Sequence, residues 1–176
     1  MQHATSWAAD DAFAITEWDP ERFGVGIRQI DAQHRQLLAI TNHICRLKTT
    51  LEHDPGALTP VARKRGGVTD RHLEPQLQRG GQLAVHLDEL VTYCAKHLAA
   101  EEVLLETHGY SERVSHAADH DTLVQEVARA HRLCEEGNME MADLRRIVAF
   151  LRHWMNTHIP KDRRFAPLLL DKGYGA

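Results

Sequence analysis

Hydrophobic positions recur at intervals of three and four residues along four long stretches of the chain. The stretches cover residues 30–45, 82–108, 111–136 and 139–159. This spacing matches the 3.6-residue period of an α-helix that buries one face and exposes the other. Gly109 follows the second stretch, as is common where a helix ends. The pattern therefore predicts four long amphipathic helices.

Each predicted helix has an inner face that mixes apolar residues with a few histidines. The first inner face is expected to carry Ile30, His34, Leu37, Leu38, Thr41, Ile44 and Cys45, and the second Leu83, Leu87, Leu90, Cys94, His97, Glu101, Leu104 and His108. The third is expected to carry His116, His120, Leu123, Val127 and Cys134, and the fourth Leu144, Ile147, Val148, Leu151, Trp154, Met155 and His158.

The connections between these stretches set the predicted topology. Two short turns follow the second and third helices, whereas residues 54–81 form a long, basic connection rich in Pro and Gly. Short turns join antiparallel neighbours. We therefore predict an all-α, antiparallel up-down-up-down four-helix bundle over residues 15–176, in which 54–81 is an insertion loop. Residues 1–14 are expected to form a flexible arm, 18–26 an irregular segment, and 163–170 a short C-terminal helix.

Composition narrows the class of protein. The 176 residues are 43% hydrophobic and 26% charged, which fits a single globular domain. The net charge of −4 argues against a nucleic-acid partner, and no apolar run is long enough to predict a membrane span. Three cysteines without a Cys-x-x-Cys pair, and a start without a secretory signal, predict free thiols and a cytoplasmic location.

Histidine is unusually abundant, with 13 residues, and several histidines lie on the predicted inner faces. Three pairs of these residues and nearby carboxylates are spaced four residues apart, so both members of each pair project from one side of a helix. The pairs are His97 and Glu101, His116 and His120, and His158 and Asp162. Antiparallel packing brings the start of the first and third helices level with the end of the second and fourth. The residues expected to converge are His34, His97, Glu101, His116, His120, His158 and Asp162.

So many ionisable groups in a dry core need compensation, because each buried charge costs several kcal/mol. A bound metal supplies it. Imidazole and carboxylate together suit iron, zinc, copper or nickel. Seven ligands exceed one tetrahedral zinc site, the His-Glu-x-x-His protease motif is absent, and ferritin-like di-iron sites use more glutamates. The set therefore predicts a centre with two metals.

These motifs, in this order and spacing, resemble those of the bacterial hemerythrin family over about residues 16–170. The matching motifs are Trp18-Asp19, Gly26-Ile27, Ile30-Asp31-Ala32-Gln33-His34, His97-x-x-x-Glu101-Glu102, His116-x-x-x-His120 and Trp154-x-x-x-His158-Ile159. The resemblance implies a four-helix bundle that binds O2 reversibly at two non-haem irons with a bridging oxo or hydroxo group.

The resemblance also implies a ligand set. His116, His120 and His158 would hold one iron, His34 and His97 the other, and Glu101 and Asp162 would bridge them. Five imidazoles and three bridging groups fill eleven of the twelve positions of two octahedral irons. The open position would bind a small diatomic ligand beside the two-histidine iron, in a pocket lined by Ile30, Trp154 and Met155.

Two features depart from the family pattern. The connection 54–81 is longer than usual, which makes it a candidate surface for a protein partner. Only three residues, among them Pro160, separate His158 from Asp162, where the family generally has four. Because proline lacks a backbone N–H, we expect the helix to tighten or unwind there so that Asp162 still bridges.

Three functions remain open from the sequence. The first is O2 storage, delivery or sensing without turnover. The second is a di-iron enzyme, such as a peroxidase, an oxidase or an NO reductase, built on the same ligands. The third is an interaction module whose irons report redox state while 54–81 binds a partner. The sequence does not determine the oligomeric state.

Overall fold

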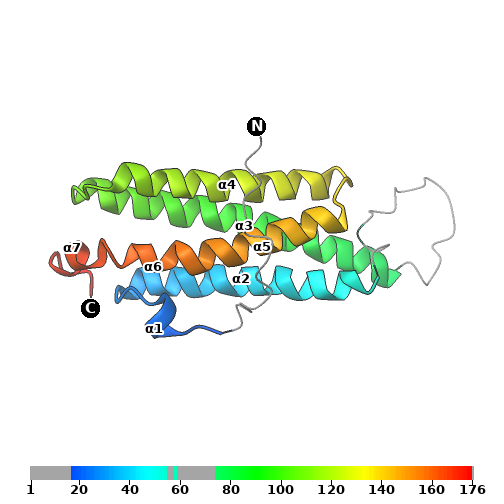
Figure 1. Cartoon of the computed structure of the whole chain (residues 1–176), viewed down its shortest axis with the longest axis horizontal. Coiled ribbons are helices and arrows are strands. Elements are labelled where there is room, and N and C mark those ends of the chain that lie inside the picture. Colours follow the sequence, from blue (N-terminus) through cyan, green and yellow to red (C-terminus); the bar gives the residue numbers. More distant parts are fainter. Residues whose placement is uncertain (1–16, 55–57, 59–73, 176) are drawn as a thin grey trace.

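The computed structural model describes residues 17–54, 58 and 74–175, and all regular structure in these residues is helical. Four long helices form the body of the molecule, and three short ones lie toward the same end of it (Figure 1). The helices are α1 (Pro20–Phe23), α2 (Arg28–Glu52), α3 (Glu74–Thr107), α4 (Arg113–Glu135), α5 (Met141–Thr157), α6 (Ile159–Asp162) and α7 (Ala166–Leu170).

The long helices run antiparallel in chain order, which confirms the predicted up-down-up-down bundle (Figure 1). Helix α3 packs on α2 and α4, and α5 packs on the same two helices. Gly109 and Gly137, in the turns before α4 and α5, have φ of 68° and 72°. This left-handed conformation is readily adopted by glycine and lets each helix reverse direction within a few residues.

The buried apolar residues form two separate clusters. The larger, which we call the main core, runs through the bundle from Leu51 and Leu83 to Trp154 and Met155. The smaller, the end cluster, comprises Val25, Ile27, Ile30, Leu105, Phe165, Ala166 and Leu169. Along each long helix, the predicted site residues fall between or at the border of these clusters. A polar layer therefore separates two apolar ones.

Helix α3 differs from its predicted form in two ways. It begins at Glu74 rather than Gln82, so the connection before it is shorter than 54–81 suggested. Proline is tolerated in the first turn of a helix, and each interior glycine costs only about 1 kcal/mol, so neither feature prevents the earlier start. The prediction that Leu104 lies on the inner face was wrong, because Leu105 is fully buried and Leu104 is not. The buried face of α3 therefore continues from Glu101 to Leu105, a step of four residues.

The segments at the bundle ends are more regular than the sequence indicated. Residues 18–26, predicted to be irregular, contain α1, because Asp19 accepts a hydrogen bond from the Glu21 backbone N–H (2.9 Å) and Pro20 starts the helix. The short C-terminal helix is present as α7. Cys45 and Cys134, predicted on inner faces, are only partly buried because they lie at the edges of those faces.

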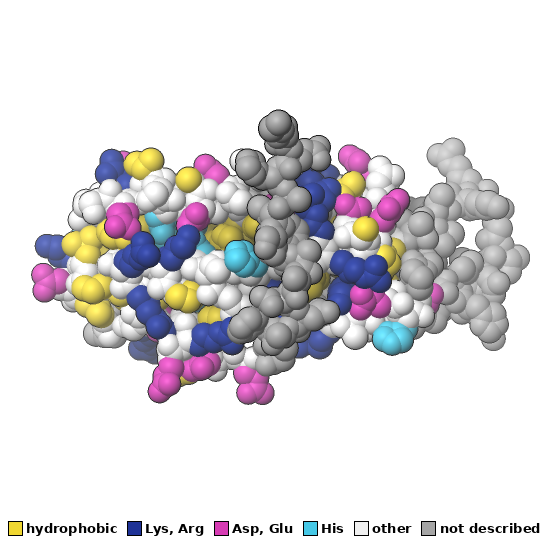
Figure 2. All heavy atoms as spheres, viewed as in Figure 1, with side chains coloured by type: hydrophobic (Ala, Val, Ile, Leu, Met, Phe, Trp, Pro, Cys, Tyr) yellow, Lys and Arg dark blue, Asp and Glu magenta, His cyan; other side chains and the backbone are white. Residues whose placement is uncertain are grey.

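Other sequence predictions fall on parts of the chain that are not described. The arm at residues 1–14 lies outside the described residues, as does most of 54–81. None of the helices in the described parts of the chain combines the length and apolar character needed to span a membrane. On the face shown in Figure 2, basic and acidic side chains are interspersed with small hydrophobic areas between them.

Truncation of a main-core side chain should destabilise the bundle. Leu90 of α3 is fully buried, so Leu90→Ala is expected to lower the free energy of unfolding by about 2–5 kcal/mol through lost burial and a cavity. Val85 of the same helix is 64% exposed, and Val85→Ala should change it by less than about 0.5 kcal/mol. Urea denaturation followed by circular dichroism measures both, and equal effects would contradict this description of the core.

Candidate metal centre

The structure brings all seven predicted site residues together at one end of the bundle. They come from α2, α3, α4, the residue between α5 and α6, and α6 itself: His34, His97, Glu101, His116, His120, His158 and Asp162. None of these seven is more than 6% exposed, although all are polar. Their convergence follows from the topology, because the ends of α3 and α5 lie beside the starts of α2 and α4 (Figure 1).

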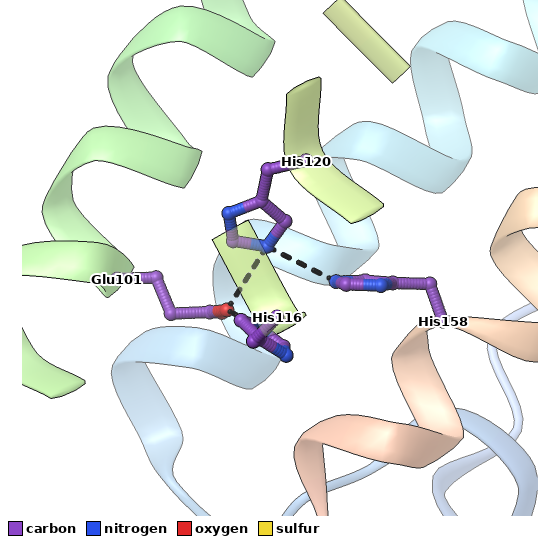
Figure 3. A group of neighbouring side chains, drawn as sticks. All are labelled: Glu101, His116, His120 and His158. Atoms are coloured by element: carbon purple, nitrogen blue, oxygen red, sulfur yellow. Dashed lines mark hydrogen bonds and ion pairs between the residues drawn. The ribbon is translucent and has the colours of Figure 1, made fainter. Parts of the chain in front are cut away.

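Four of these residues form one compact group, shown in Figure 3. Glu101 comes from α3, His116 and His120 come from α4, and His158 follows α5. His116 Nε2 donates to Glu101 Oε1 at 2.6 Å, and His120 Nε2 lies 3.4 Å from the same oxygen. His120 Nε2 and His158 Nε2 are 3.1 Å apart. The donor atoms of the four residues thus point at one small volume.

A second group shares one carboxylate with the first. His34, His97 and Glu101 have ligand atoms within 4.8 Å of one another, and the two imidazole rings meet edge-on with centroids 5.2 Å apart. Glu101 therefore belongs to both groups. A carboxylate between two clusters of imidazoles has the arrangement needed to contact two cations.

Asp162 also approaches histidines of both groups. Its Oδ2 is 3.2 Å from His34 Nε2, and its Oδ1 is 3.6 Å from His116 Nε2 and 3.5 Å from His158 Nε2. The three-residue spacing does not prevent this, because the chain tightens after α5. The Lys161 backbone N–H donates to the His158 carbonyl at 2.6 Å, a three-residue step. Each carboxylate oxygen of Asp162 thereby faces a different group.

Burial keeps most of the imidazoles neutral. It lowers the pKa of His97 to about 4 and also lowers the pKa of His34 and His158. Burial has the same effect on His120, but hydrogen bonds and charges from Glu101 and Glu102 outweigh it and raise this pKa. Neutral imidazoles have a free lone pair, which is the form that binds metals.

The pKa values of Glu101 and Asp162 shift in opposite directions. Burial by itself raises the pKa of Glu101, but hydrogen bonds from His116 and His120 outweigh it and hold this pKa below its usual range. Burial and the nearby charge of Glu101 raise the pKa of Asp162 well above its ordinary value. Two carboxylates with no cation between them cannot both ionise easily in this layer. A bound cation would reverse that penalty.

Several atoms of the layer lack hydrogen-bond partners among the described residues. They are both carboxylate oxygens of Asp162, Oε2 of Glu101, both ring nitrogens of His34 and Nδ1 of His158. An unsatisfied buried polar group costs about 1–3 kcal/mol, so native structures rarely leave several together. Nitrogen and oxygen donors in this ratio suit a first-row transition metal such as iron. The residues present therefore fit a pair of such ions.

Three further residues, which the sequence analysis did not identify, contact the outer sides of the histidines. His97 Nδ1 donates to Gln33 Oε1 at 3.0 Å, and His120 Nδ1 donates to Glu102 Oε1 at 2.8 Å. His158 Nδ1 lies 3.6 Å from Asp119 Oδ2. The two hydrogen bonds fix the ring orientation and tautomer of His97 and His120, whereas the approach of Asp119 to His158 is too long for a hydrogen bond. Each residue is adjacent in sequence to a predicted site residue, the one signal that could have identified them.

The three predicted pocket residues are all buried next to the polar layer. Trp154 stacks on His158 with ring centroids 4.1 Å apart and an interplanar angle of 18°. Met155 belongs to the main core and Ile30 to the end cluster. Apolar side chains thus border the layer on both sides.

Comparison with known proteins gives a consistent result. The family described as hemerythrin HHE cation binding domain matches residues 25–169. The chain is 26% identical over 158 residues to bacteriohemerythrin of Methylococcus capsulatus, covering 89% of this chain and 98% of that protein. It is 27% identical over 149 residues to bacteriohemerythrin of Stenotrophomonas maltophilia, covering 85% and 77%.

The fold also resembles solved structures. A crystal structure of wild-type hemerythrin superposes with a TM-score of 0.64 at 24% identity, covering 89% of this chain and 98% of the other. This similarity shows that the two chains share a four-helix bundle.

The burial cost of the layer predicts the behaviour of the metal-free protein. With a chelator present, His34→Leu should raise the free energy of unfolding by about 1–2 kcal/mol, because it removes a buried polar ring whose Nε2 lacks a hydrogen bond. Urea denaturation in the chelator buffer measures this. His153→Leu, at an exposed position of α5, is the control and should have little effect. A less stable His34→Leu would show that the imidazole is well accommodated without metal.

Proposed function

Because the chain belongs to the hemerythrin family, we propose that it binds O2 reversibly at a centre of two non-haem irons held in the polar layer. The observation that carries this proposal is the pair of donor groups that share Glu101. One buried cation would need only one group, whereas two groups joined by a carboxylate suit two ions.

We assign His116, His120 and His158 to one iron, and His34 and His97 to the other. Glu101 and Asp162 would bridge them. Support for the Glu101 bridge comes from its place in both donor groups. Support for Asp162 comes from its two oxygens, which face His34 on one side and His116 and His158 on the other.

When bound, the two irons supply O2 binding coupled to reversible electron transfer to the ligand. The protein's part is to set the number of donors on each side. Three histidines on one side and two on the other leave the two-histidine side one donor short, which makes it the side for a small diatomic ligand. The apolar side chains of Ile30, Trp154 and Met155 would limit access of water and anions to that position.

We propose storage, delivery or sensing of O2 in the cytoplasm rather than turnover. This agrees with the O2 binding that membership of the hemerythrin family implies. Binding of a protein partner through residues 54–81 remains a separate proposal.

Metal analysis with an optical spectrum of the aerobically isolated protein tests the centre. We expect two irons per chain, no haem, and near-ultraviolet charge-transfer bands that change on adding azide. The reduced protein should bind O2 and release it when the gas is removed. One zinc per chain without a visible band would refute the proposal. Steady-state consumption of O2, peroxide or NO with a reductant would instead identify an enzyme.

Met155 provides a test of the ligand pocket. It is buried three residues before His158, so Met155→Ala should open the pocket to water and anions. We expect faster autoxidation and faster azide binding with unchanged iron content, and parent-like rates for Met155→Leu. Stopped-flow absorbance measures these rates.

Leu151→Ala is the matched control for Met155→Ala, because Leu151 is equally buried in α5 but one turn further from His158. It should leave both rates unchanged. Equal autoxidation in Met155→Ala and the parent, or equal acceleration in Leu151→Ala, would remove Met155 from the pocket.

A further inference from the structure

Asp119 of α4 contacts three residues of the α5–α6 region. Its backbone carbonyl accepts a hydrogen bond from Trp154 Nε1 at 3.4 Å, and its Oδ2 accepts one from Lys161 Nζ at 2.7 Å. The same Oδ2 lies 3.6 Å from His158 Nδ1. Asp119 is therefore the point on α4 where the end of α5 and the start of α6 are attached.

These contacts hold the His158 ring from two directions. Trp154 covers one face of the imidazole, in a nearly parallel stack, while the Asp119 carboxylate lies beside the outer nitrogen. The inner nitrogen is left facing the polar layer, 3.1 Å from His120 Nε2. A ring fixed in this way keeps its metal-facing nitrogen in one place.

Lys161 connects Asp119 to the segment that carries Asp162. It directly precedes Asp162, so its bond to Asp119 ties α6 to α4 one residue away from the buried carboxylate. Helix α6 has only four residues, and Pro160 has no backbone N–H to donate. The side-chain hydrogen bond from Lys161 Nζ to Asp119 Oδ2 joins this short segment directly to α4.

We propose that Asp119 and Lys161 are positioning residues for the metal centre, an inference that rests on the proposed di-iron function. Their ion pair sets His158 and Asp162, separated by a shortened segment, at the level where both can hold metal. Neither residue faces the polar layer: the two side chains are 40% and 42% exposed. Exposed ion pairs contribute little to folding stability, so the effect of this pair should be local.

The chain offers a matched control for an ordinary surface ion pair. Arg146 Nη2 donates to Glu126 Oε1 at 2.7 Å, which also joins α5 to α4, and the two side chains are 45% and 24% exposed. This pair lies near the middle of both helices, with Glu126 six residues after His120 and Arg146 twelve residues before His158. A role that came only from tying the two helices together would be shared by both pairs.

Iron retention under anaerobic, reducing conditions tests the proposal without depending on O2 binding. Lys161→Met and Asp119→Asn should release iron to a ferrous chelator about 10–100-fold faster than the parent, as expected for loss of outer contacts to metal ligands. Asp119→Asn keeps the backbone carbonyl that Trp154 contacts, so it tests the carboxylate alone. Lys161→Arg, which preserves the ion pair, should retain iron as the parent does, and so should Arg146→Met.

Thermal unfolding of the chelator-treated proteins separates positioning from folding, because all four variants should melt close to the parent. Parent-like release from Lys161→Met and Asp119→Asn would overturn the inference, and so would equally fast release from Arg146→Met. In both cases the proposed function would still stand, because the parent protein would still hold iron. A parent that holds no iron would instead overturn the proposed function, and this inference with it.

Discussion

The main constraint on this molecule is the burial of seven ionisable side chains in one layer of a small bundle. Apolar clusters lie on both sides of the layer, so water cannot solvate these groups. Burying an ion costs several kcal/mol even after relaxation. The lowered pKa of His34, His97 and His158, the raised pKa of Asp162 and the hydrogen bonds to Glu101 reduce that cost only in part. The layer is therefore best understood as a site whose stability depends on bound cations.

The same constraint explains why the site is built on helices and finished by a short, irregular end. Helices α2 to α5 place the histidines by their periodicity alone, whereas Asp162 reaches the layer only because the chain tightens after His158. Precision at that point comes from contacts made by Asp119 with α5 and α6. Rigid helices set most of the geometry, and a few polar contacts at their margin set the remainder.

Most of the fold and the seven converging residues could be predicted from the sequence because both follow from helical period and antiparallel packing. That Leu105 rather than Leu104 of α3 is buried could not be predicted, since three- and four-residue steps are equally compatible with a helix. The contacts of Gln33, Glu102 and Asp119 were also missed. They lie at the edges of helix faces, where polar residues are ordinary and burial leaves no periodic signal. Only the rotation of each helix about its axis decides which of them meets a histidine.

The order of the site residues along the chain has a consequence for how the protein matures in the cell. Donors extend from His34 to Asp162, and the end cluster that closes the layer needs Phe165 and Leu169 from the last part of the chain. A ribosome-bound chain lacking the residues after α4 would offer at most four of the five imidazoles, without the part of the cover that Phe165 and Leu169 supply. The complete donor set, with His158 and Asp162 in place, can therefore form only once the last part of the chain has been synthesised.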